Sequence, residues 1–351
     1  MEAALPREHY TDPEYFTRER EMLRRQWTCI ARLADLGLTG AGRVAVVDFY
    51  GESIVVTHDG TLHAHANVCR HRGSQLLSAD CAPCDMKVLR CSYHSWTYGL
   101  DGALLHAPHA EGIERADFAL TSLAVDAWGG WLWLAEEPAE SLLTQLGEVP
   151  DRVRRYPLAD LVLGVRFSYQ VGANWKVIAE NYNECYHCGP VHPELCRLVP
   201  DFAGGGRDIH WDDGVPHRDG AWTFTMTGTS DRAPFPDLDE HERVRHKGEL
   251  IYPNLMLSLA AEHAAAFVLT PVSIDRTIVT CDLLFAPNER EKPTFDPSDS
   301  GDFWDLVNRQ DWGVCESVQR GMTSRYFRGG WYAPMEDTSL DIRRWLLARL
   351  K

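Results

Sequence analysis

The sequence predicts an α+β protein, made of a small β domain and a larger domain in which helices lie on one side of an antiparallel sheet. Its 351 residues suffice for two packed domains and are few for three. Short strand-like runs separated by turn residues fill the chain from Arg43 to about Ala135. After Asp151, longer strand-like segments lie between two helical ones, and this mixture indicates the α+β layout.

Three segments follow from this change of pattern. We expect a helical lead-in over residues 1–42 that packs on the second domain, a β domain over 43–145 and the second domain over 146–351. Within the lead-in, Thr11-Asp12 is a suitable cap before a proline in the first helical turn. A helix is therefore predicted over 13–27.

Local patterns predict the remaining elements. In the β domain, His58-Asp59-Gly60 and Asp101-Gly102 are typical of hairpin turns. In the second domain, residues 221–227 alternate as in a strand, with Trp222, Phe224 and Met226 on one face. The other predicted elements are helices over 174–186 and 302–322, two strands around Asp275-Arg276 and a surface loop over 230–247.

The composition is that of a globular protein that binds neither nucleic acid nor membranes. Hydrophobic residues make up 44% and charged residues 25% of the chain, which is ordinary for such a protein. A formal net charge of −16 argues against the basic face that nucleic acids require. The longest apolar runs, such as 264–269, are far too short to cross a bilayer. Because the first ten residues contain no signal-peptide pattern, the cytoplasm is the expected compartment.

Ten cysteines in a chain expected to be cytoplasmic indicate metal ligation before disulfides. Most of them fall in two clusters, and three are scattered. The clusters are Cys69, Cys81, Cys84 and Cys91, and Cys185, Cys188 and Cys196; the scattered residues are Cys29, Cys281 and Cys315. We expect the scattered cysteines to be small buried apolar side chains.

Two cysteines and two histidines stand in two short segments of the β domain. Cys69-Arg70-His71 is followed, after nineteen residues, by Cys91-Ser92-Tyr93-His94. A Rieske [2Fe–2S] cluster needs this donor set, with cysteines on one iron and histidines on the other. A structural zinc site is the alternative, but a zinc finger pairs its cysteines first and its histidines second, around a helix. The sequence therefore predicts that Cys69, His71, Cys91 and His94 hold a Rieske cluster.

At these motifs the chain resembles the α subunits of ring-hydroxylating Rieske oxygenases. The matching segments are Asn67–Gly73 and Cys91–Tyr98, with Asp101-Gly102 after them. The chain departs from the family pattern at Ser92, where proline is usual, and at Ser95, where glycine is usual. The segment between the loops is also a few residues longer than is usual in the family. It holds Cys81 and Cys84, which we expect to be spare thiols because two ligands alone make a poor metal site.

His187 and His192 mark a second metal site. Gly189-Pro190 lies between them and should end or bend the predicted helix, so that His187 lies on its last turn and His192 comes from the next segment. Two imidazoles and one carboxylate with open positions form the facial triad of oxygen-activating Fe(II) enzymes. A purely structural role is the alternative for two nearby histidines. Against it, Asn174-Trp175-Lys176 and Glu180–His187 resemble the mononuclear-iron motif of the same family.

The carboxylate ligand is predicted on the last helix. Its expected apolar stripe is Phe303, Val307, Val314, Val318 and Met322. Asp311 falls within this stripe, where a carboxylate without a cation would be costly, whereas Asp302, Asp305 and Glu316 lie off it as surface charges. Gln310-Asp311-Trp312 also resembles the segment that carries the family's ligand aspartate. We therefore predict that His187, His192 and Asp311 hold a mononuclear iron.

The resemblance implies the rest of the system. It implies a helix-grip-like antiparallel sheet around the iron, O2 as co-substrate, and a flavin/iron–sulfur reductase (or a ferredoxin plus reductase) that passes electrons from NAD(P)H to the cluster. In the family, an acidic residue at the position of Glu184 bridges the mononuclear site to a Rieske histidine of the neighbouring subunit, here His94, in a homotrimer. Glu184 together with Asn183, Cys185 and Cys188 resembles the branch that acts on choline, glycine betaine, carnitine and stachydrine.

The expected function is therefore that of the oxygenase component of a Rieske monooxygenase. It would hydroxylate a small nitrogen-containing substrate such as a betaine or methylamine, with demethylation when the carbon is an N-methyl group. An aromatic-ring dioxygenase is the alternative within the family. A Rieske ferredoxin, which only carries electrons, is disfavoured because it needs no second metal site and no second domain.

Aromatic side chains suggest how such a substrate would be held. Trp222, Phe224 and Met226 are expected on one strand face, and Tyr182 one turn before the iron ligands. Aromatic faces attract a methylated ammonium through cation–π interaction. The same stripe is also typical of plain core and would suit a flat aromatic substrate, so it leaves both substrate classes open.

Overall fold

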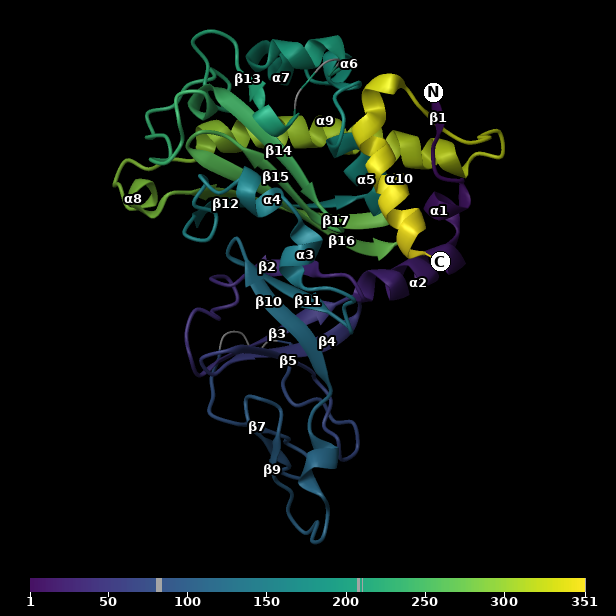
Figure 1. Ribbon diagram of the computed structural model, residues 1–351, viewed down its shortest axis with the longest axis vertical. Helices are drawn as coiled ribbons and strands as arrows, with labels where there is room; N and C mark the ends of the chain where they lie inside the picture. The colour runs from purple at the N-terminus through teal and green to yellow at the C-terminus, as the bar shows by residue number, and fades with distance from the viewer. Residues whose placement is uncertain (80–83, 207–208, 210, 351) are drawn as a thin grey trace. The chain divides into compact units, whose positions relative to one another are not determined.

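The chain forms two compact units in the computed structural model (Figure 1). The larger unit comprises Met1–Met22 and Leu146–Lys351, and the smaller one comprises Leu23–Gln145. The boundary between the two units falls at Leu23, inside the segment expected as a lead-in. The residues that the structure describes are 1–79, 84–206, 209 and 211–350.

The smaller unit is an all-β structure apart from short helical turns. Within its described residues, a seven-stranded antiparallel sheet has the order β2-β11-β10-β5-β4-β3-β6, and three short strands form a second sheet, β7-β8-β9. The strands are β2 (Thr28–Arg32), β3 (Arg43–Phe49), β4 (Glu52–His58), β5 (Leu62–Ala66), β6 (Cys84–Asp85), β7 (Leu89–Arg90), β8 (Thr97–Tyr98), β9 (Leu104–His106), β10 (Ser122–Trp128) and β11 (Trp131–Ala135).

Both hairpins predicted in this unit are confirmed. Strands β4 and β5 pair on either side of His58-Asp59-Gly60, and β8 and β9 pair around Asp101-Gly102. At Gly102 the positive φ of 83° favours glycine. A Cβ there would also lie 2.5 Å from the ring of His65, so packing excludes any larger residue.

The larger unit is built on one antiparallel sheet. Among the residues that the structure describes, its six strands have the order β12-β17-β16-β15-β14-β13. They are β12 (Val162–Val171), β13 (Val215–Pro216), β14 (Arg245–Ile251), β15 (Leu255–Leu259), β16 (His263–Ser273) and β17 (Arg276–Phe285). Strands β16 and β17 confirm the two strands predicted around Asp275-Arg276. The short strands β1 (Glu2–Ala3) and β18 (Trp331–Tyr332) pair separately.

The strand predicted over 221–227 is wrong. This segment is an irregular connection in which Phe224 is fully buried and Met226 is 49% exposed. Local hydrogen bonds replace a strand ladder, since Thr225 Oγ1 donates to the carbonyl of Thr229 (2.9 Å) and the amide of Gly228 donates to Thr225 Oγ1 (3.0 Å). Threonine side chains offer the backbone this alternative to a sheet.

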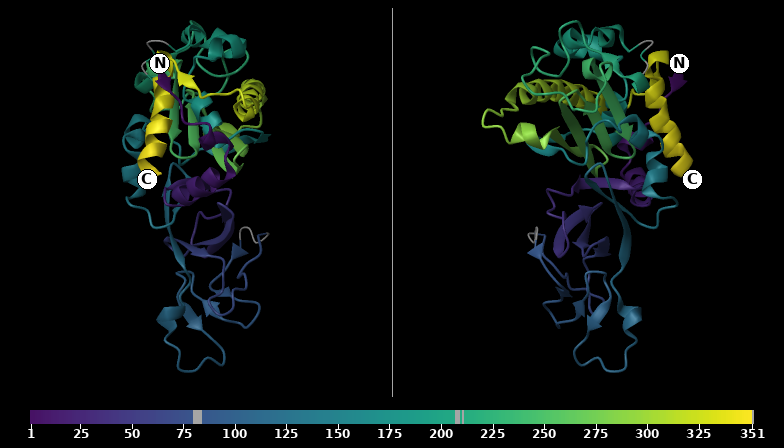
Figure 2. Two further views of the ribbon diagram at one scale, coloured as in Figure 1. Left: turned by 90° about the vertical axis from the view of Figure 1, so that its right-hand side faces the viewer. Right: turned by 60° about the vertical axis from the view of Figure 1, so that its left-hand side comes forward.

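The long helix α9, yellow-green in Figure 2, packs on α5 and on strand β12 of this sheet. Helix α2 confirms the prediction over 13–27 but ends at Arg24, and α10 was not predicted. The α-helices of the chain are α1 (Glu8–Thr11), α2 (Pro13–Arg24), α3 (Leu142–Leu146), α4 (Val149–Arg152), α5 (Trp175–Tyr182), α6 (Cys188–Val191), α7 (Pro193–Leu198), α8 (Pro287–Arg290), α9 (Ser298–Thr323) and α10 (Asp337–Arg349).

Helix α5 is shorter than predicted. It begins as expected at Asn174, whose side chain accepts a hydrogen bond from the amide of Lys176 (3.0 Å). It ends at Tyr182, because Asn183 instead bonds to α10, exchanging hydrogen bonds with the carbonyl and hydroxyl of Thr338. A contact with a distant helix thus ends α5 and leaves the following residues free of helical geometry.

The inward stripe predicted on α9 is correct only in part. Phe303, Val307 and Met322 are buried as expected. Val318 is 40% exposed, however, and Cys315 and Gln319 take the inward positions instead. Gln319 is tolerated there because its amide accepts from the backbone of Asn174 (2.9 Å) and donates to the carbonyl of Tyr10 (2.9 Å).

A buried polar network fixes α5 against the start of the chain. Lys176 Nζ lies 2.8 Å from both carboxylate oxygens of Glu19, and Trp175 Nε1 donates to the same carboxylate (2.9 Å). Further along α5, Glu180 accepts hydrogen bonds from the hydroxyls of Tyr10 (2.5 Å) and Tyr332 (2.7 Å). Removing one partner of such a buried ion pair costs about 3–5 kcal/mol, so this network holds the helix that leads into the second predicted site.

Candidate metal centres

Two loops of the smaller unit bring Cys69 and Cys91 together inside its core. Both side chains are buried and pack with Trp96 and Tyr98 in one core cluster. Each loop is closed by its own backbone. The amide of Cys69 donates to the carbonyl of Ser74, and the amide of Cys91 donates to the carbonyl of Trp96, both at 2.8 Å. The two sulfur atoms are therefore positioned mainly by local chain geometry.

The two predicted histidines lie beside each other on the same loops. The ring centroids of His71 and His94 are 4.6 Å apart, and His71 stacks on Trp96 at 5.0 Å. His94 Nδ1 is buried and has no hydrogen-bond partner among the described residues, as expected of a nitrogen reserved for a metal. Two thiols and two imidazoles converge here, and this donor set fits a Rieske cluster.

The backbone conformation of Ser95 accounts for the glycine that is usual at this position. Its φ is 61°, in the left-handed region that glycine adopts without strain. The amide of Ser95 donates to the carbonyl of Cys91 (3.0 Å), which closes the turn around the cysteine. Its hydroxyl accepts a hydrogen bond from Arg90 (2.9 Å), a contact that glycine could not make.

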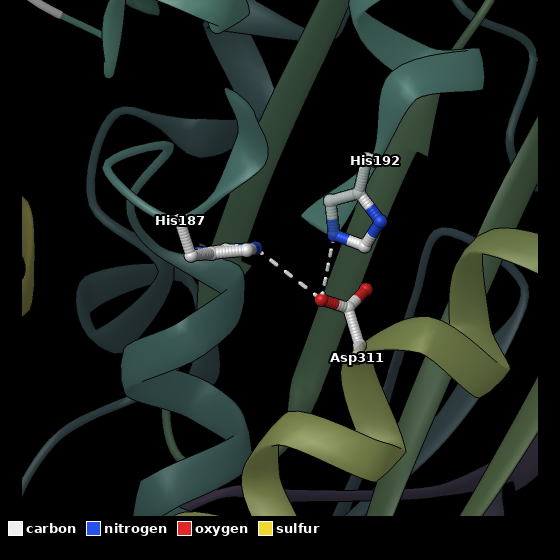
Figure 3. A group of neighbouring side chains, drawn as sticks. All are labelled: His187, His192 and Asp311. Atoms are coloured by element: carbon white, nitrogen blue, oxygen red, sulfur yellow. Dashed lines mark hydrogen bonds and ion pairs between the residues drawn. The ribbon is translucent and has the colours of Figure 1, made fainter. Parts of the chain in front are cut away.

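Three separate segments of the larger unit supply the second predicted ligand set (Figure 3). His187 directly precedes α6, His192 stands between α6 and α7, and Asp311 projects from α9. The expected position of His187 on the last turn of the preceding helix is wrong, because α5 ends at Tyr182. The break at Gly189-Pro190 takes the form of the single-turn helix α6, which turns the chain between the two histidines.

The three side chains meet at one carboxylate oxygen. Asp311 Oδ1 lies 2.9 Å from His192 Nε2 and 3.3 Å from His187 Nε2. One donor atom from each of the three lies within 4.8 Å of the others. Figure 3 shows both rings pointing toward this oxygen from different directions. Asp305, on the same helix as Asp311, instead accepts a hydrogen bond from the hydroxyl of Tyr169 (2.8 Å).

The electrostatics of this group favour a cation. Burial opposes charge on His187, but the carboxylates of Asp311 and Glu184 outweigh burial and raise its pKa to about 9. Burial would raise the pKa of Asp311, yet hydrogen bonds from His187 and His192 hold that pKa below its usual value. Two carboxylates therefore stabilise positive charge between the rings, and two imidazoles plus one carboxylate fit a mononuclear Fe(II) with open positions.

Each histidine has a different outer partner. His187 Nδ1 lies 2.6 Å from Glu184 Oε1, whereas His192 Nδ1 lies 2.8 Å from the amide oxygen of Gln310. Gln310 is oriented in turn by Glu194, which accepts from its amide nitrogen (3.1 Å). Such partners fix the tautomer of a metal-binding histidine and leave its other nitrogen free for the metal. Both Nε2 atoms consequently face Asp311.

A cavity of about 300 Å³ opens beside this group. His187, His192 and Asp311 form part of its wall, and the remaining wall includes six aromatic and four acidic residues. The aromatic residues are Tyr182, Phe202, Trp211, Phe224, Tyr252 and Trp304; the carboxylates outside the ligand group are Glu184, Asp212, Glu249 and Asp341. Arg152 also lines the cavity, but its guanidinium bonds to both oxygens of Glu249 (2.6 and 2.8 Å).

The residues that line the cavity correct the prediction of an aromatic stripe that holds the substrate. Of Trp222, Phe224 and Met226, Phe224 alone lines the cavity, together with the predicted Tyr182. The other aromatic residues come from segments that carry no local signal, because only the folded chain brings them together. The role of Gln310 as the partner of His192 was also not predicted, although Gln310 directly precedes the predicted ligand Asp311 on α9.

Two of the predictions about the clustered cysteines are wrong. Cys185 and Cys188 form a disulfide, so the expectation of metal ligation before disulfides is wrong for this pair. Cys84 is disulfide-bonded as well and is not a spare thiol, while Cys81 lies outside the described residues. The buried positions predicted for the scattered cysteines are confirmed at Cys29, Cys281 and Cys315.

Comparison with protein-family models identifies the family to which this chain belongs. A profile described as "Rieske [2Fe-2S] domain" matches residues 26–120, and one described as "Ring hydroxylating alpha subunit (catalytic domain)" matches residues 158–351. The chain is a Rieske oxygenase α subunit. Members of this family use a Rieske cluster, a mononuclear non-haem iron and O2, and the predicted fold class and cofactors of this oxygenase are thereby confirmed.

Named relatives of this oxygenase are monooxygenase components. It is 31% identical to the carnitine monooxygenase oxygenase subunit of Acinetobacter pittii, over 93% of this chain and 86% of that protein. It is 29% identical to the glycine betaine monooxygenase oxygenase subunit of Chromohalobacter salexigens, over 94% and 82%.

Solved structures agree on the fold. The quaternary ammonium Rieske monooxygenase CntA in complex with an inhibitor superposes with a TM-score of 0.77 at 27% identity, over 99% of this chain and 96% of that one. Naphthalene 1,2-dioxygenase from Rhodococcus sp. gives a TM-score of 0.74 at 18% identity, over 99% and 94%, and shares the fold alone. Among the described helices of the oxygenase, none is both long and apolar enough to cross a membrane.

Proposed function

We propose that this oxygenase hydroxylates an N-methyl carbon of a small quaternary ammonium or tertiary amine and so releases that methyl group as formaldehyde. The observation that carries the proposal is the wall of the cavity beside His187, His192 and Asp311, which combines aromatic faces with four further carboxylates against one arginine. Aromatic faces and negative charge together suit a methylated cation, whereas a neutral arene gains nothing from the carboxylates. The relatives named for carnitine and glycine betaine are consistent with it.

The proposed ligand roles follow from the two converging groups. Cys69 and Cys91 would hold one iron of the cluster, and His71 and His94 the other. The mononuclear Fe(II) would be held by the Nε2 atoms of the two histidines and by Asp311. When bound, this iron supplies the activation of O2 with electrons that arrive through the cluster. Accordingly, residues 43–145 are proposed as the electron-receiving Rieske domain and 146–351 as the catalytic domain, with 1–42 as the lead-in.

The chain's own residues divide the remaining tasks. Glu184 holds the proton of His187 Nδ1 at 2.6 Å, and we assign it the bridge from His187 to His94 of the partner subunit. Gln310 holds His192 in the matching tautomer. The aromatic wall, with Phe224 at its buried centre between Phe303 (5.5 Å) and Trp304 (5.2 Å), orients the methylammonium group and excludes water.

The chemistry balances as a monooxygenation. One methyl C–H bond becomes C–OH with one oxygen atom of O2, while two electrons and two protons convert the other oxygen atom to water. The resulting N–CH2OH group then breaks at its C–N bond, giving formaldehyde and the demethylated amine, together with one proton when the substrate is a quaternary ammonium. The electrons require a separate reductase that draws on NAD(P)H, and the bridge through Glu184 requires a ring of subunits, for which we propose a homotrimer. We propose the cytoplasm as the compartment, since such a reductase depends on its nicotinamide pool.

Substrate-dependent oxygen consumption with a surrogate reductase tests this function. A panel of choline, betaines, carnitine and tertiary methylamines should contain at least one compound that yields formaldehyde in a one-to-one ratio with oxygen consumed. The Asp311→Ala protein is the control for oxygen reduced by the cluster alone. A cis-diol or phenol formed from an arene, with no turnover of any methylamine, would overturn the proposal.

The aromatic wall has its own test. Trp211→Leu should weaken binding of the best methylammonium substrate relative to its neutral carbon isostere by about 0.5–2 kcal/mol, or roughly 2- to 30-fold. Equal losses for the cation and the isostere would show that Trp211 contributes only shape.

A further inference from the structure

Cys185 and Cys188 enclose one of the proposed iron ligands. The two cysteines form a disulfide with a sequence separation of three, so Tyr186 and His187 lie within the ring that it closes. Both cysteines are buried, at 5% and 3% exposure, and both line the cavity beside the ligand group. Electron transfer, substrate binding and ligation, as described above, use neither sulfur atom.

One of the two sulfur atoms lies next to the metal-facing side of His187. Cys188 Sγ is 4.0 Å from His187 Nε2, the nitrogen that faces Asp311. In a metal site, a thiolate and an imidazole on the same ion bind at about 2.3 and 2.0 Å, so their donor atoms come to lie within about 4 Å of each other. Cys188 therefore already stands at the separation from His187 that two ligands of one ion would have.

We propose that the Cys185–Cys188 disulfide masks Cys188 as an additional metal ligand, and that its reduction changes the metal preference of the site. In the disulfide, the sulfur of Cys188 is bound to carbon and sulfur and carries no charge for a metal. Two histidines and Asp311 then leave positions open, as Fe(II) oxygen chemistry requires. With a free thiolate added, the same site becomes four-coordinate and closed, which is the arrangement that Zn(II) prefers.

Packing keeps the sulfur in place when the disulfide opens. A Cβ on Gly206 would lie 3.3 Å from Cys185 Cβ, and one on Gly189 would lie 3.0 Å from the carbonyl oxygen of Ala203. The segment that carries both cysteines is thus in close contact with the chain that follows it. The thiol of Cys196 also donates to the carbonyl of Cys188 (3.3 Å). Reduction is therefore expected to rotate side chains rather than to displace the backbone.

The redox step involves two electrons. Two molecules of a low-molecular-weight thiol reduce the Cys185–Cys188 bond, giving two protein thiols and one small-molecule disulfide. When a metal then binds Cys188, the thiol proton passes to solvent. In the reverse direction, hydrogen peroxide oxidises the two thiols to the disulfide and is itself reduced to two waters. The cavity gives small reagents a route to both sulfur atoms.

Two single variants separate ligation from simple tethering. Cys185→Ser and Cys188→Ser both abolish the disulfide, but only Cys185→Ser leaves a thiol beside His187. Each purified oxygenase is equilibrated with equal Fe(II) and increasing Zn(II), with and without prior reduction by a phosphine that is then removed. Metal content is measured by elemental analysis and free thiols by mass spectrometry after alkylation. Cys196→Ser, in the same segment but outside the disulfide, is the matched control.

The expected results are opposite for the two variants. Reduced wild-type protein and Cys185→Ser should exchange mononuclear iron for zinc at a Zn(II) concentration about ten-fold or more below that needed by oxidised wild-type protein. Cys188→Ser should keep the preference of the oxidised protein whether reduced or not, and Cys196→Ser should behave as wild type. Co(II) in the same site should show thiolate-to-metal absorption in Cys185→Ser and in reduced wild-type protein, but not in Cys188→Ser or in oxidised wild-type protein.

Identical metal preferences in Cys185→Ser and Cys188→Ser would overturn the proposal and leave the disulfide as a tether. The inference rests on the proposed mononuclear iron site but not on the proposed substrate. If the wild-type protein binds no mononuclear iron, the proposed function itself is refuted. If the wild type and all variants bind iron with the same preference over zinc, only the masked ligand is refuted.

Discussion

The two metal centres of this oxygenase are built on different principles. The four proposed cluster ligands come from two short loops, 69–71 and 91–94, which close through their own backbone hydrogen bonds. His187 and His192 flank α6 and Asp311 lies on α9, so these three proposed iron ligands meet only because segments far apart in the sequence pack together. A site of the first kind is defined by local sequence, and one of the second kind by tertiary packing.

Their surroundings differ in the same way. Backbone groups and the hydroxyl of Tyr98, 3.3 Å from Cys69 Sγ, support the cysteines. Side chains support the iron ligands, with Glu184 behind His187 and Gln310 behind His192. Point variants should therefore perturb the iron site in steps, because each outer partner can be removed alone, whereas the cluster should be lost in one step when a ligand is removed.

The largest effect is expected for Cys91→Ser. Serine cannot supply the thiolate, and the buried loop has no second sulfur to replace it, so the cluster should be lost whole. Iron should fall from about three to about one per chain, the visible absorption should disappear and turnover should stop. Elemental analysis with absorption spectroscopy checks this outcome. A wild-type protein that binds zinc and stays colourless after reconstitution would contradict the cluster assignment.

Asp311→Ala should affect the other centre alone. Removing the shared carboxylate leaves two neutral imidazoles, so the mononuclear iron should be lost and the iron content should fall from about three to about two per chain. The visible spectrum should be unchanged and turnover abolished. Asp302→Ala removes an exposed carboxylate from the same helix and is the matched control. Full activity of Asp311→Ala, with Asp302 or Asp305 essential instead, would disprove the ligand assignment.

Glu184→Gln tests the connection between the centres. Both metals should remain, but multiple turnover should fall by roughly 100-fold, because the amide cannot accept the proton of His187 Nδ1 as a carboxylate does. Pre-reduced protein mixed with substrate and O2 in a stopped-flow instrument should reoxidise its cluster very slowly. Reoxidation at the wild-type rate would take Glu184 out of the electron path.

The same contrast explains what could be predicted from sequence. The cysteine–histidine spacing and the hairpins are local, and they were predicted. Asp311 was predicted from helical periodicity even though Val318 on that stripe proved exposed, because Val307 and Asp311 lie one turn apart whichever residues continue the stripe. The end of α5 could not be predicted, since it depends on Asn183 meeting Thr338 of α10. The aromatic wall is likewise a product of packing.

Gln310→Leu should have the smallest effect, and it sharpens the comparison most. The amide oxygen of Gln310 lies 2.8 Å from His192 Nδ1, so leucine leaves that nitrogen without its partner and frees the ring to change tautomer. Iron affinity should fall roughly 10-fold, with the cluster spectrum unchanged. Gln310→Glu keeps an acceptor at the same place and should retain the affinity. If leucine and glutamate lower the affinity equally, the hydrogen bond to His192 does not support the site, and packing of α9 alone positions this ligand.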